Sequence, residues 1–201
     1  MIEIDKLDFT KLDGLIPAIV IDSSTEQVLM LGFMNKESLQ KTFTTHQVTF
    51  YSRTRKCLWT KGETSGNFLE LVEIKSDCDY DTLLVYAIPT GNTCHKGDYS
   101  CFGIEKNNLK FLNQLFQLIK TRKAEMPENS YTAKLFKEGS NRIIQKVGEE
   151  AIETVIAAKN KDKNEIINEV SDLVYHLFVL LAELDIELKD IVDKLVERHN
   201  K

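Results

Sequence analysis

Residues 105–119, Glu-Lys-Asn-Asn-Leu-Lys-Phe-Leu-Asn-Gln-Leu-Phe-Gln-Leu-Ile, mark the point where the pattern of the chain changes from strand to helix. Four apolar residues recur here at intervals of three and four: Leu109, Leu112, Phe116 and Ile119. That spacing is the period of an amphipathic helix. The polar tetrapeptide 105–108 comes directly before it, so we expect two domains, residues 1–106 and 107–201.

The part of the chain before this joint is typical of β-structure. Residues 48–54 alternate in polarity and are rich in β-branched and aromatic side chains. Four further runs of the same kind cover residues 15–21, 27–33, 68–74 and 82–88. A short helix is expected after Asn35, which is a good N-cap residue.

The part after the joint continues with the helical period. Apolar stripes cover residues 143–155, 166–181 and 191–195, and short polar breaks separate them. The fold class predicted for the whole chain is therefore α+β, with a mostly-β N-terminal domain joined to an all-α helical bundle.

Composition narrows the range of partners and compartments. The chain has 201 residues and a formal net charge of −5, which argues against a nucleic-acid backbone as partner but suits a charged small molecule carried with metal ions. The start of the chain lacks the pattern of a signal peptide, and the most apolar stretch, residues 173–184, is too short to span a membrane. Four cysteines in such a chain are expected to be thiols or metal ligands of a cytoplasmic protein.

The segment Asp77-Cys-Asp-Tyr-Asp81 leads into the predicted strand 82–88. If it is extended, its three aspartates share one face and Cys78 lies on the other. Three adjacent carboxylates repel one another unless a cation lies among them. Oxygen ligands suit Mg²⁺, and a thiolate suits a softer metal such as Zn²⁺. A solvated acidic turn is the alternative for the segment taken alone.

Two more thiols follow in Cys94-His-Lys-Gly-Asp-Tyr-Ser-Cys101. Together with Cys78 they make three thiolates, one fewer than a closed structural zinc site needs. Three protein ligands and one open position are typical of a catalytic zinc, which holds and acidifies water. Ordinary buried thiols are the alternative if the cysteines are considered by themselves.

Residues 51–67 combine ligands for an anion with an aromatic plane. Glycines at two positions permit backbone N–H groups to approach a phosphate, basic side chains supply charge, and the tryptophan can stack on a base. The candidate substrate-binding residues are Arg53, Arg55, Trp59, Lys61, Gly62, Ser65 and Gly66. No Gly-Lys-Ser/Thr follows, so the segment is not a P-loop, and a plain basic loop is the alternative.

Taken together, these segments resemble the phosphoribosyl-AMP cyclohydrolases of histidine biosynthesis. The matching stretches occur in order within residues 8–104: Tyr51-Ser-Arg-x-Arg, Leu58-Trp-x-Lys-Gly-Glu-x-Ser-Gly-Asn67, Asp77-Cys-Asp-x-Asp81 and Cys94-His-x-Gly-x-x-Ser-Cys-Phe102. Asn92 stands where the family commonly has proline, and Lys96 where it commonly has threonine. Neither departure removes a metal ligand.

The resemblance implies hydrolysis of the purine N1–C6 bond by an obligate homodimer with zinc between its subunits. One chain would supply Cys78, and the other would supply Cys94 and Cys101. The resemblance also implies Mg²⁺ on three aspartates: Asp77, Asp79 and Asp81. His95 is the candidate catalytic group that moves protons, and a supporting role beside the metal is the alternative.

The helical half carries two acidic pairs, Glu150-x-x-Glu153 and Glu169-x-x-Asp172, each one helical turn apart. Only Lys146 offers local charge compensation to these acids. Both helices also carry apolar stripes, so we expect them to pack antiparallel across the short connection 159–164. This packing brings the pairs together as a carboxylate cage for Mg²⁺, while two solvated acidic faces are the alternative.

The spacing of these acids is similar to that of the all-α nucleotide pyrophosphohydrolases. More narrowly, residues 130–136, 146–151 and 172–177 resemble phosphoribosyl-ATP pyrophosphohydrolase. The resemblance implies Mg²⁺ on five acids, Glu149, Glu150, Glu153, Glu169 and Asp172, of which Glu150 and Glu153 are the catalytic candidates. Local chemistry alone suggests four basic residues for neutralising phosphate charge: Lys134, Lys137, Arg142 and Lys146.

The two resemblances concern consecutive reactions, because the product of the C-terminal half is the substrate of the N-terminal half. The sequence therefore predicts a bifunctional hydrolase with nucleotide substrates, Zn²⁺ and Mg²⁺, and no nucleic-acid or membrane partner. One alternative is a general nucleotide pyrophosphatase in which only the helical half is active. Another is a dimeric interaction module with a structural zinc. A zinc nucleoside deaminase is excluded, because its His-x-Glu and Pro-Cys-x-x-Cys signature is missing.

Overall fold

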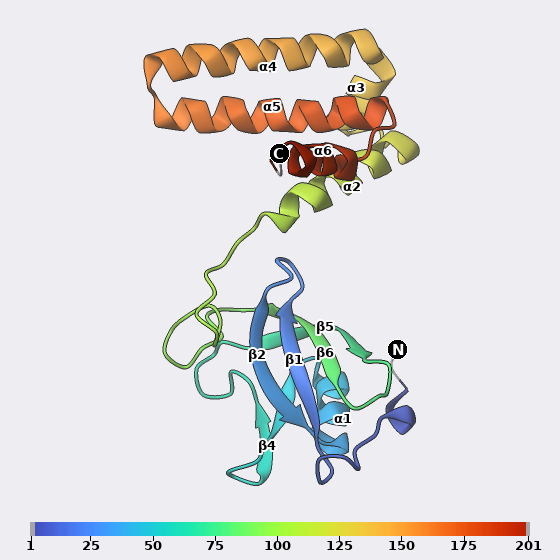
Figure 1. Cartoon of the computed structure of the whole chain (residues 1–201), viewed down its shortest axis with the longest axis vertical. Helices are drawn as coiled ribbons and strands as arrows, with labels where there is room; N and C mark the ends of the chain where they lie inside the picture. The colour runs from blue at the N-terminus through green and yellow to red at the C-terminus, as the bar shows by residue number, and fades with distance from the viewer. Residues whose placement is uncertain (1–2, 200–201) are drawn as a thin grey trace. The chain divides into compact units, whose positions relative to one another are not determined.

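The computed structural model describes residues 3–199, and the chain divides into two compact units, one ending at Lys110 and the other beginning at Phe111 (Figure 1). The domain boundary expected from the sequence, between residues 106 and 107, lies a few residues earlier. The outermost residues of both predicted domains, 1–2 and 200–201, lie outside the described part of the chain.

The N-terminal unit is built on a four-stranded sheet with the order β2-β1-β6-β5. A short 3₁₀ helix, η1 (Ile4–Lys6), precedes it, and the strands are β1 (Ile16–Asp22), β2 (Val28–Met34), β5 (Leu69–Ser76) and β6 (Leu83–Pro89). β1 pairs antiparallel with β2 and parallel with β6, and β5 pairs antiparallel with β6. The predicted runs 15–21, 27–33, 68–74 and 82–88 thus correspond to observed strands.

A proline is tolerated in the central strand β1 because of where its neighbours begin. Pro17 lies opposite Phe33 of β2, but pairing with β6 starts only at Ala18. The strand therefore has a single hydrogen-bonded neighbour at the proline, which has no N–H to donate. Side chains along β1 alternate between buried and partly exposed, as expected for a sheet with one face on the core.

Helix α1 (Lys36–Thr45) packs beside the sheet and confirms the predicted cap. The Asn35 side chain accepts a hydrogen bond from the Ser38 N–H, and the Ser38 hydroxyl accepts one from the Asn35 N–H. This reciprocal pair is a capping box. It also buries Ser38 completely without leaving its hydroxyl unsatisfied.

The segment 51–67 is less of a loop than its composition suggests. Strands β3 (Thr49–Ser52) and β4 (Cys57–Thr60) form a separate two-stranded hairpin, so the tryptophan of this segment lies on a strand. Trp59 packs against the buried Phe50, with their ring centroids 5.7 Å apart. Residues 53–56 form the turn of this hairpin, and the residues after Thr60 form a loop.

The expectation of an extended segment at Asp77–Asp81 was wrong. β5 ends at Ser76 and β6 begins at Leu83, and the residues between them form a turn in which Tyr80 has φ +63°. The Asp77 side chain accepts hydrogen bonds from the N–H groups of Asp81 and Thr82, which fixes the turn. The three aspartates are still brought together, but by the turn and not by strand alternation.

The C-terminal unit consists of helices α2 (Lys110–Glu125), α3 (Tyr131–Glu138), α4 (Ser140–Asn160), α5 (Lys163–Glu183) and α6 (Leu188–His199). α4 and α5 lie side by side and antiparallel, joined at residues 161–162, as predicted (Figure 1). The apolar stripes did not indicate α3, although its N-cap Ser130 accepts a hydrogen bond from the Ala133 N–H. The core of this unit centres on Phe116, Ile119, Ile143 and Val179.

Several members of the predicted stripes remain exposed within the single chain. Apolar side chains with more than half of their surface exposed on α4 and α5 are Ile144, Ile152, Val155, Ile156 and Ile167. The helices of the described residues are nowhere long and apolar enough to cross a bilayer.

We predict that Gly32→Ala destabilises the N-terminal unit. A Cβ at this position in β2 would lie 2.3 Å from the ring of Phe50, which is only 1% exposed and cannot easily move. We expect a loss of about 1–3 kcal/mol in the free energy of unfolding. Urea titration followed by the fluorescence of Trp59, the single tryptophan of the chain, measures this directly.

Gly148→Ala is the matched control, because a Cβ at this position in α4 meets nothing within 4 Å. That substitution should stabilise the helix by about 0.5–1 kcal/mol and leave the transition reported by Trp59 in place. Equal stability of Gly32→Ala and the wild type would show that the core around Phe50 is looser than described.

Candidate functional site

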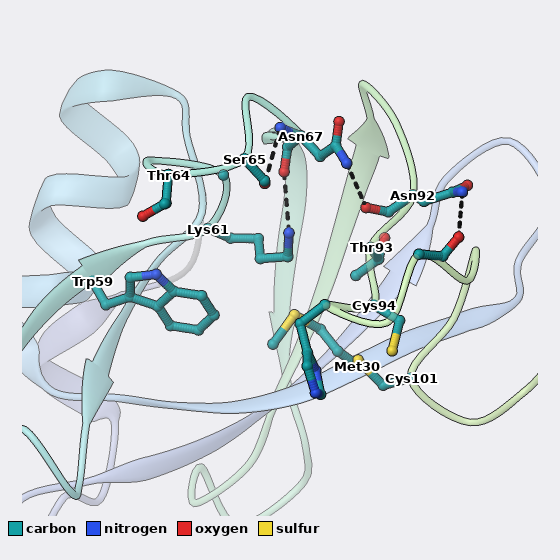
Figure 2. Close-up of a pocket in the computed structure, with 13 residues that line it drawn as sticks. Met30, Trp59, Lys61, Thr64, Ser65, Asn67, Asn92, Thr93, Cys94 and Cys101 are labelled. Carbon is teal, nitrogen blue, oxygen red and sulfur yellow. Dashed lines mark hydrogen bonds between the residues drawn. The ribbon is translucent and has the colours of Figure 1, made fainter.

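A cavity of ≈ 510 Å³ lies in the N-terminal unit and brings together residues from two separate motifs of the sequence (Figure 2). From the first motif come Trp59, Lys61, Gly62 and Ser65. From the second come Cys94, His95 and Cys101, on the loop that follows β6. An aromatic plane, a cation and two thiols thus face one space, which fits a nucleotide and a thiophilic metal.

Hydrogen bonds to the β1–β2 hairpin hold the loop that carries the two thiols. The Cys101 N–H donates to the carbonyl of Leu29 at 2.8 Å, and the buried Ser100 hydroxyl donates to the carbonyl of Val28 at 2.8 Å. The loop also turns tightly on itself, because the Cys94 N–H donates to the Asp98 carbonyl at 2.9 Å. The thiols are therefore carried by a fixed loop.

A buried carboxylate provides a further anchor for this loop. The Tyr99 hydroxyl donates to Asp22 Oδ2 at 2.7 Å, and the Ser24 hydroxyl donates to Asp22 Oδ1. Burial raises the pKa of Asp22, but the hydrogen bonds from Ser24 and Tyr99 outweigh it, and the pKa lies below its ordinary value. Burial raises the pKa of Tyr99 to about 12, so its hydroxyl stays a donor at neutral pH.

Lys61 is the cation of the cavity, although only 7% of its surface is exposed. Its ammonium donates to the backbone carbonyl of Asn67 at 3.1 Å (Figure 2). Burial lowers the pKa of Lys61, while Cys101 and Cys94 oppose this shift. Desolvation and the neighbouring Cys94 raise the pKa of Cys101. The lysine and the two thiols therefore share one electrostatic environment.

The other predicted residues of this unit lie outside the cavity. Arg53 stacks on Phe33, 3.7 Å from the ring centroid, and Arg55 lies 6.0 Å from the ring centroid of Trp59. The Gly66 N–H donates to the Gly62 carbonyl at 2.8 Å, so that amide serves the shape of the loop. Cys78 is exposed and is not among the residues from 3 to 199 that line the cavity.

The turn between β5 and β6 gathers the predicted aspartates at a separate place. Asp77, Asp79 and Asp81 each offer a carboxylate oxygen, and these oxygens lie within 4.8 Å of one another. The Lys11 ammonium is 2.7 Å from both Asp79 and Asp81 and lowers the pKa of Asp81. The set has the hard oxygen donors that Mg²⁺ prefers.

The helical unit contains a second carboxylate cluster, across α4 and α5. Oxygens of Glu150, Glu169 and Asp172 lie within 4.8 Å of one another. Partial burial raises the pKa of Glu169, and the charges of Glu153 and Glu150 add to the shift. The buried Glu150 is neutralised by Lys146 at 2.7 Å. Three oxygen donors that repel one another are what a divalent cation would relieve.

Two predicted acids of this unit lie beside the cluster. Glu149 contacts Lys146 at 2.9 Å and accepts from the Gln145 side chain at 2.7 Å, and Lys146 holds the pKa of Glu149 below its usual range. Glu153 is exposed on α4, one turn beyond Glu150. Its negative charge contributes to the raised pKa of Glu169.

The predicted basic residues form a chain of ion pairs beside these acids. Arg142 lies between Glu138 at 3.6 Å and Glu149 at 3.4 Å. Lys134 is exposed and lies 3.8 Å from Glu138, and Lys137 is exposed in the last turn of α3. Of these cations, Arg142 and Lys146 contact Glu149, whereas Lys134 pairs with Glu138 of its own helix.

Sequence reasoning missed two positions at these sites. Asn67 links the loop of Lys61 to that of Cys94, because its side-chain amide donates to the carbonyl of Asn92 at 3.1 Å. In the helical unit, His176 is 4% exposed, and its Nε2 lies 3.8 Å from Glu150 Oε1. Burial lowers the pKa of His176, and its Nδ1 has no partner among the described residues. His176 lies four residues after Asp172 on the same predicted helix, and this spacing could have indicated that its side chain faces the acidic cluster.

Comparison with known proteins matches both parts of the chain. Residues 30–103 match the family described as phosphoribosyl-AMP cyclohydrolase, and residues 112–199 match that described as phosphoribosyl-ATP pyrophosphohydrolase. The histidine biosynthesis bifunctional protein HisIE of Escherichia coli strain K12 is 55% identical over 194 residues, which cover 96% of this chain and 96% of that protein. The HisIE protein of Shewanella oneidensis is 52% identical over 199 residues, covering 99% of this chain and 94% of that protein.

We predict that Tyr99→Phe destabilises the loop that carries the two thiols, because the buried Asp22 carboxylate loses a donor. The free energy of unfolding of the N-terminal unit should fall by about 1–3 kcal/mol. The exposed Tyr80 provides the control, since Tyr80→Phe should be nearly neutral.

The effect of Tyr99→Phe should also depend on pH. The folded-state pKa of Asp22 is lowered, so its stabilisation is present above the unfolded-state value of about 3.9 and is lost as the pH falls through the lower folded-state value. The difference from wild type, measured by denaturation at several pH values, should shrink below about pH 4. A difference that grows in acid would contradict this role for Asp22.

Proposed function

The chain belongs to the family of bifunctional HisIE proteins of histidine biosynthesis, and we propose that its two units use different metal ions for their two hydrolytic reactions. It is an enzyme with phosphoribosyl-ATP pyrophosphohydrolase and phosphoribosyl-AMP cyclohydrolase activities. The C-terminal unit releases pyrophosphate from phosphoribosyl-ATP. The N-terminal unit then opens the purine ring of phosphoribosyl-AMP at the N1–C6 bond, giving the formimino product.

The observation that carries the proposal is the contrast between the ligands of the two units. One cavity holds the Cys94 and Cys101 thiols with a base-stacking tryptophan, and the helical unit holds three carboxylates within 4.8 Å. Thiolates select zinc, whereas carboxylates select magnesium. We assign Zn²⁺ to the first site and Mg²⁺ to the second.

The residues around the thiols fit a zinc ion. The Lys96 N–H donates to Cys94 Sγ at 3.5 Å, and the positive charge of Lys61 opposes the burial that raises the pKa of Cys101. Zinc, when bound, supplies a Lewis acid that acidifies water at the reacting carbon. The cavity provides two thiol ligands, whereas a catalytic zinc usually has three protein ligands. We assign Cys78 as the third ligand.

The other residues of this cavity position the substrate. Trp59 offers a face for the purine ring, and Lys61 offers an ammonium to an anionic group or to the charge that develops on the ring. His95 is exposed at the rim of the cavity, where its imidazole can move protons to and from the ring nitrogen.

In the helical unit Glu150, Glu169 and Asp172 would hold Mg²⁺, with Glu149 and Glu153 beside them. Magnesium, when bound, neutralises the triphosphate and aligns it for attack between the α and β phosphates. Lys146 pairs with Glu150 at 2.7 Å, and Arg142, Lys134 and Lys137 are candidates for neutralising phosphate charge. In the N-terminal unit, the aspartate cluster of the β5–β6 turn would hold a separate Mg²⁺.

We further propose that the enzyme is a homodimer with zinc sites shared between subunits, acting in the cytoplasm. Cys78 is exposed and outside the cavity, so a second chain can supply it to the Cys94 and Cys101 pair of the first. The exposed apolar face on α4 and α5 also supports self-association. Four free cysteines fit a reducing compartment.

A pair of variants tests the assignment of the two reactions. Cys101→Ser should abolish zinc binding and lower ring opening by at least about 100-fold while pyrophosphate release continues. Glu150→Gln should do the reverse, lowering pyrophosphate release by a similar factor. Mass spectrometry with phosphoribosyl-ATP or phosphoribosyl-AMP as substrate follows each step. Glu165→Gln, at the start of α5, is the control for the second variant.

A complementation experiment tests the shared zinc site. The variants Cys78→Ser and Cys101→Ser should each be inactive in ring opening, but a mixture that has exchanged subunits contains heterodimers with one intact site. We expect about a quarter of the wild-type activity, since random exchange makes half of the dimers mixed. A mixture as inactive as its two components would place all three thiols in one chain or exclude Cys78 as a ligand.

A further inference from the structure

Lys11 makes an unusual contact with the aspartate cluster of the β5–β6 turn. Its ammonium donates to Asp79 Oδ2 at 2.7 Å and to Asp81 Oδ2 at 2.7 Å. The partners are 68 and 70 residues away in the chain, so the contact is a property of the tertiary fold. One monovalent cation therefore already bridges two of the three carboxylates.

Hydrogen bonds and buried side chains hold the segment around Lys11 in a position from which its ammonium contacts the aspartates. The Asp8 N–H donates to the Tyr80 carbonyl at 2.9 Å, which ties the segment to the turn itself. The Asp8 side chain accepts from the Thr10 N–H at 2.9 Å and from its hydroxyl at 2.6 Å, while the Gly14 N–H donates to the Phe9 carbonyl at 2.9 Å. Leu7 and Phe9 are buried and anchor the segment in the core.

We propose that Lys11 is a built-in counter-ion of the aspartate cluster, which a divalent cation must displace from Asp79 and Asp81 to bind there. The inference rests on the proposed Mg²⁺ site at these aspartates. The ammonium is 2.7 Å from both Asp79 Oδ2 and Asp81 Oδ2, so a divalent cation bound to these carboxylates would lie close to it, and the two positive charges would repel each other. Asp77 is different, because its Oδ1 accepts from two backbone N–H groups of the turn at 3.1 Å.

Two consequences follow from this competition. The affinity for a divalent cation is lower than the three carboxylates alone would give, because the ammonium has to leave first. Residues 8–14 also lose one of their attachments to the turn when the cation binds, so metal occupancy changes the position of Lys11. In the metal-free protein, Lys11 offsets the repulsion among the three carboxylates.

The test measures Mn²⁺ binding by titration calorimetry on the full-length, zinc-loaded chain. The helical carboxylates are first removed by Glu150→Gln, Glu169→Gln and Asp172→Asn, so that the aspartate cluster is the carboxylate site under study. In this background Lys11→Met should tighten Mn²⁺ binding roughly 3- to 10-fold. Lys11→Gln should do the same, and Lys11→Arg, which keeps the charge, should not.

Lys6→Met is the matched control, because Lys6 is a similarly exposed lysine of the same segment that pairs with Glu3 at 3.0 Å. It should leave the Mn²⁺ affinity within about twofold of the background. A second measurement is thermal unfolding without Mn²⁺. Lys11→Met should lower the midpoint more than Lys6→Met does, and added Mn²⁺ should recover the difference.

The outcomes separate this inference from the metal assignment beneath it. Unchanged or weaker Mn²⁺ binding by Lys11→Met, in a background that binds Mn²⁺, overturns the counter-ion role and leaves the metal site standing. Binding seen only after Lys11→Met supports the role strongly. If neither chain binds Mn²⁺, the aspartates are not a metal site, and both proposals fail.

Discussion

Carboxylates brought within 4.8 Å of one another repel one another, and this repulsion shapes both units of the protein. In each unit the positive charge of a lysine offsets part of this repulsion. Lys11 bridges two aspartates of the β5–β6 turn, and Lys146 contacts Glu149 and Glu150 on α4. The two lysines differ in their separation from their partners along the sequence. Lys146 is three and four residues from its partners on the same helix, whereas Lys11 is 68 and 70 residues from its aspartates. Lys146 does not contact Glu169 or Asp172 in any ion pair of the described residues, whereas Lys11 already contacts two of the three aspartates of its cluster.

The thiols of the N-terminal unit depend on a different constraint, the fixed course of the loop after β6. Hydrogen bonds to the β1–β2 hairpin and to buried Asp22 hold that loop, and Tyr99 packs against the core. Because Asp22 is at the end of β1, the central sheet determines where the thiols lie relative to Lys61 and Trp59. The chemistry at the cavity therefore relies on the rigidity of the sheet.

The sequence predicted most of this architecture, because periodicity and capping are local. The strands, the Asn35 cap and the antiparallel α4–α5 pair were confirmed, whereas α3 was missed because it is too short to show an apolar stripe. The turn at Asp77–Asp81 was misjudged as extended, since nothing in the residue types requires the positive φ of Tyr80. Lys11 could not be assigned to its aspartates, because a pairing across 68 residues is decided only by the folded sheet.

The choice of ligand types explains how two hydrolyses can share one chain. In the proposed assignment, the carboxylates of the helical site would hold magnesium and the thiols of the cavity would hold zinc, which thiolates bind far more strongly than carboxylates do. Had both sites used the same ligands, the metal of one would have competed for the other. Because the ligands differ, each site can be loaded in the presence of both metals. The first reaction shortens the triphosphate to a single phosphate on the same ribose, and the smaller charge suits a cavity with an aromatic plane and one buried cation.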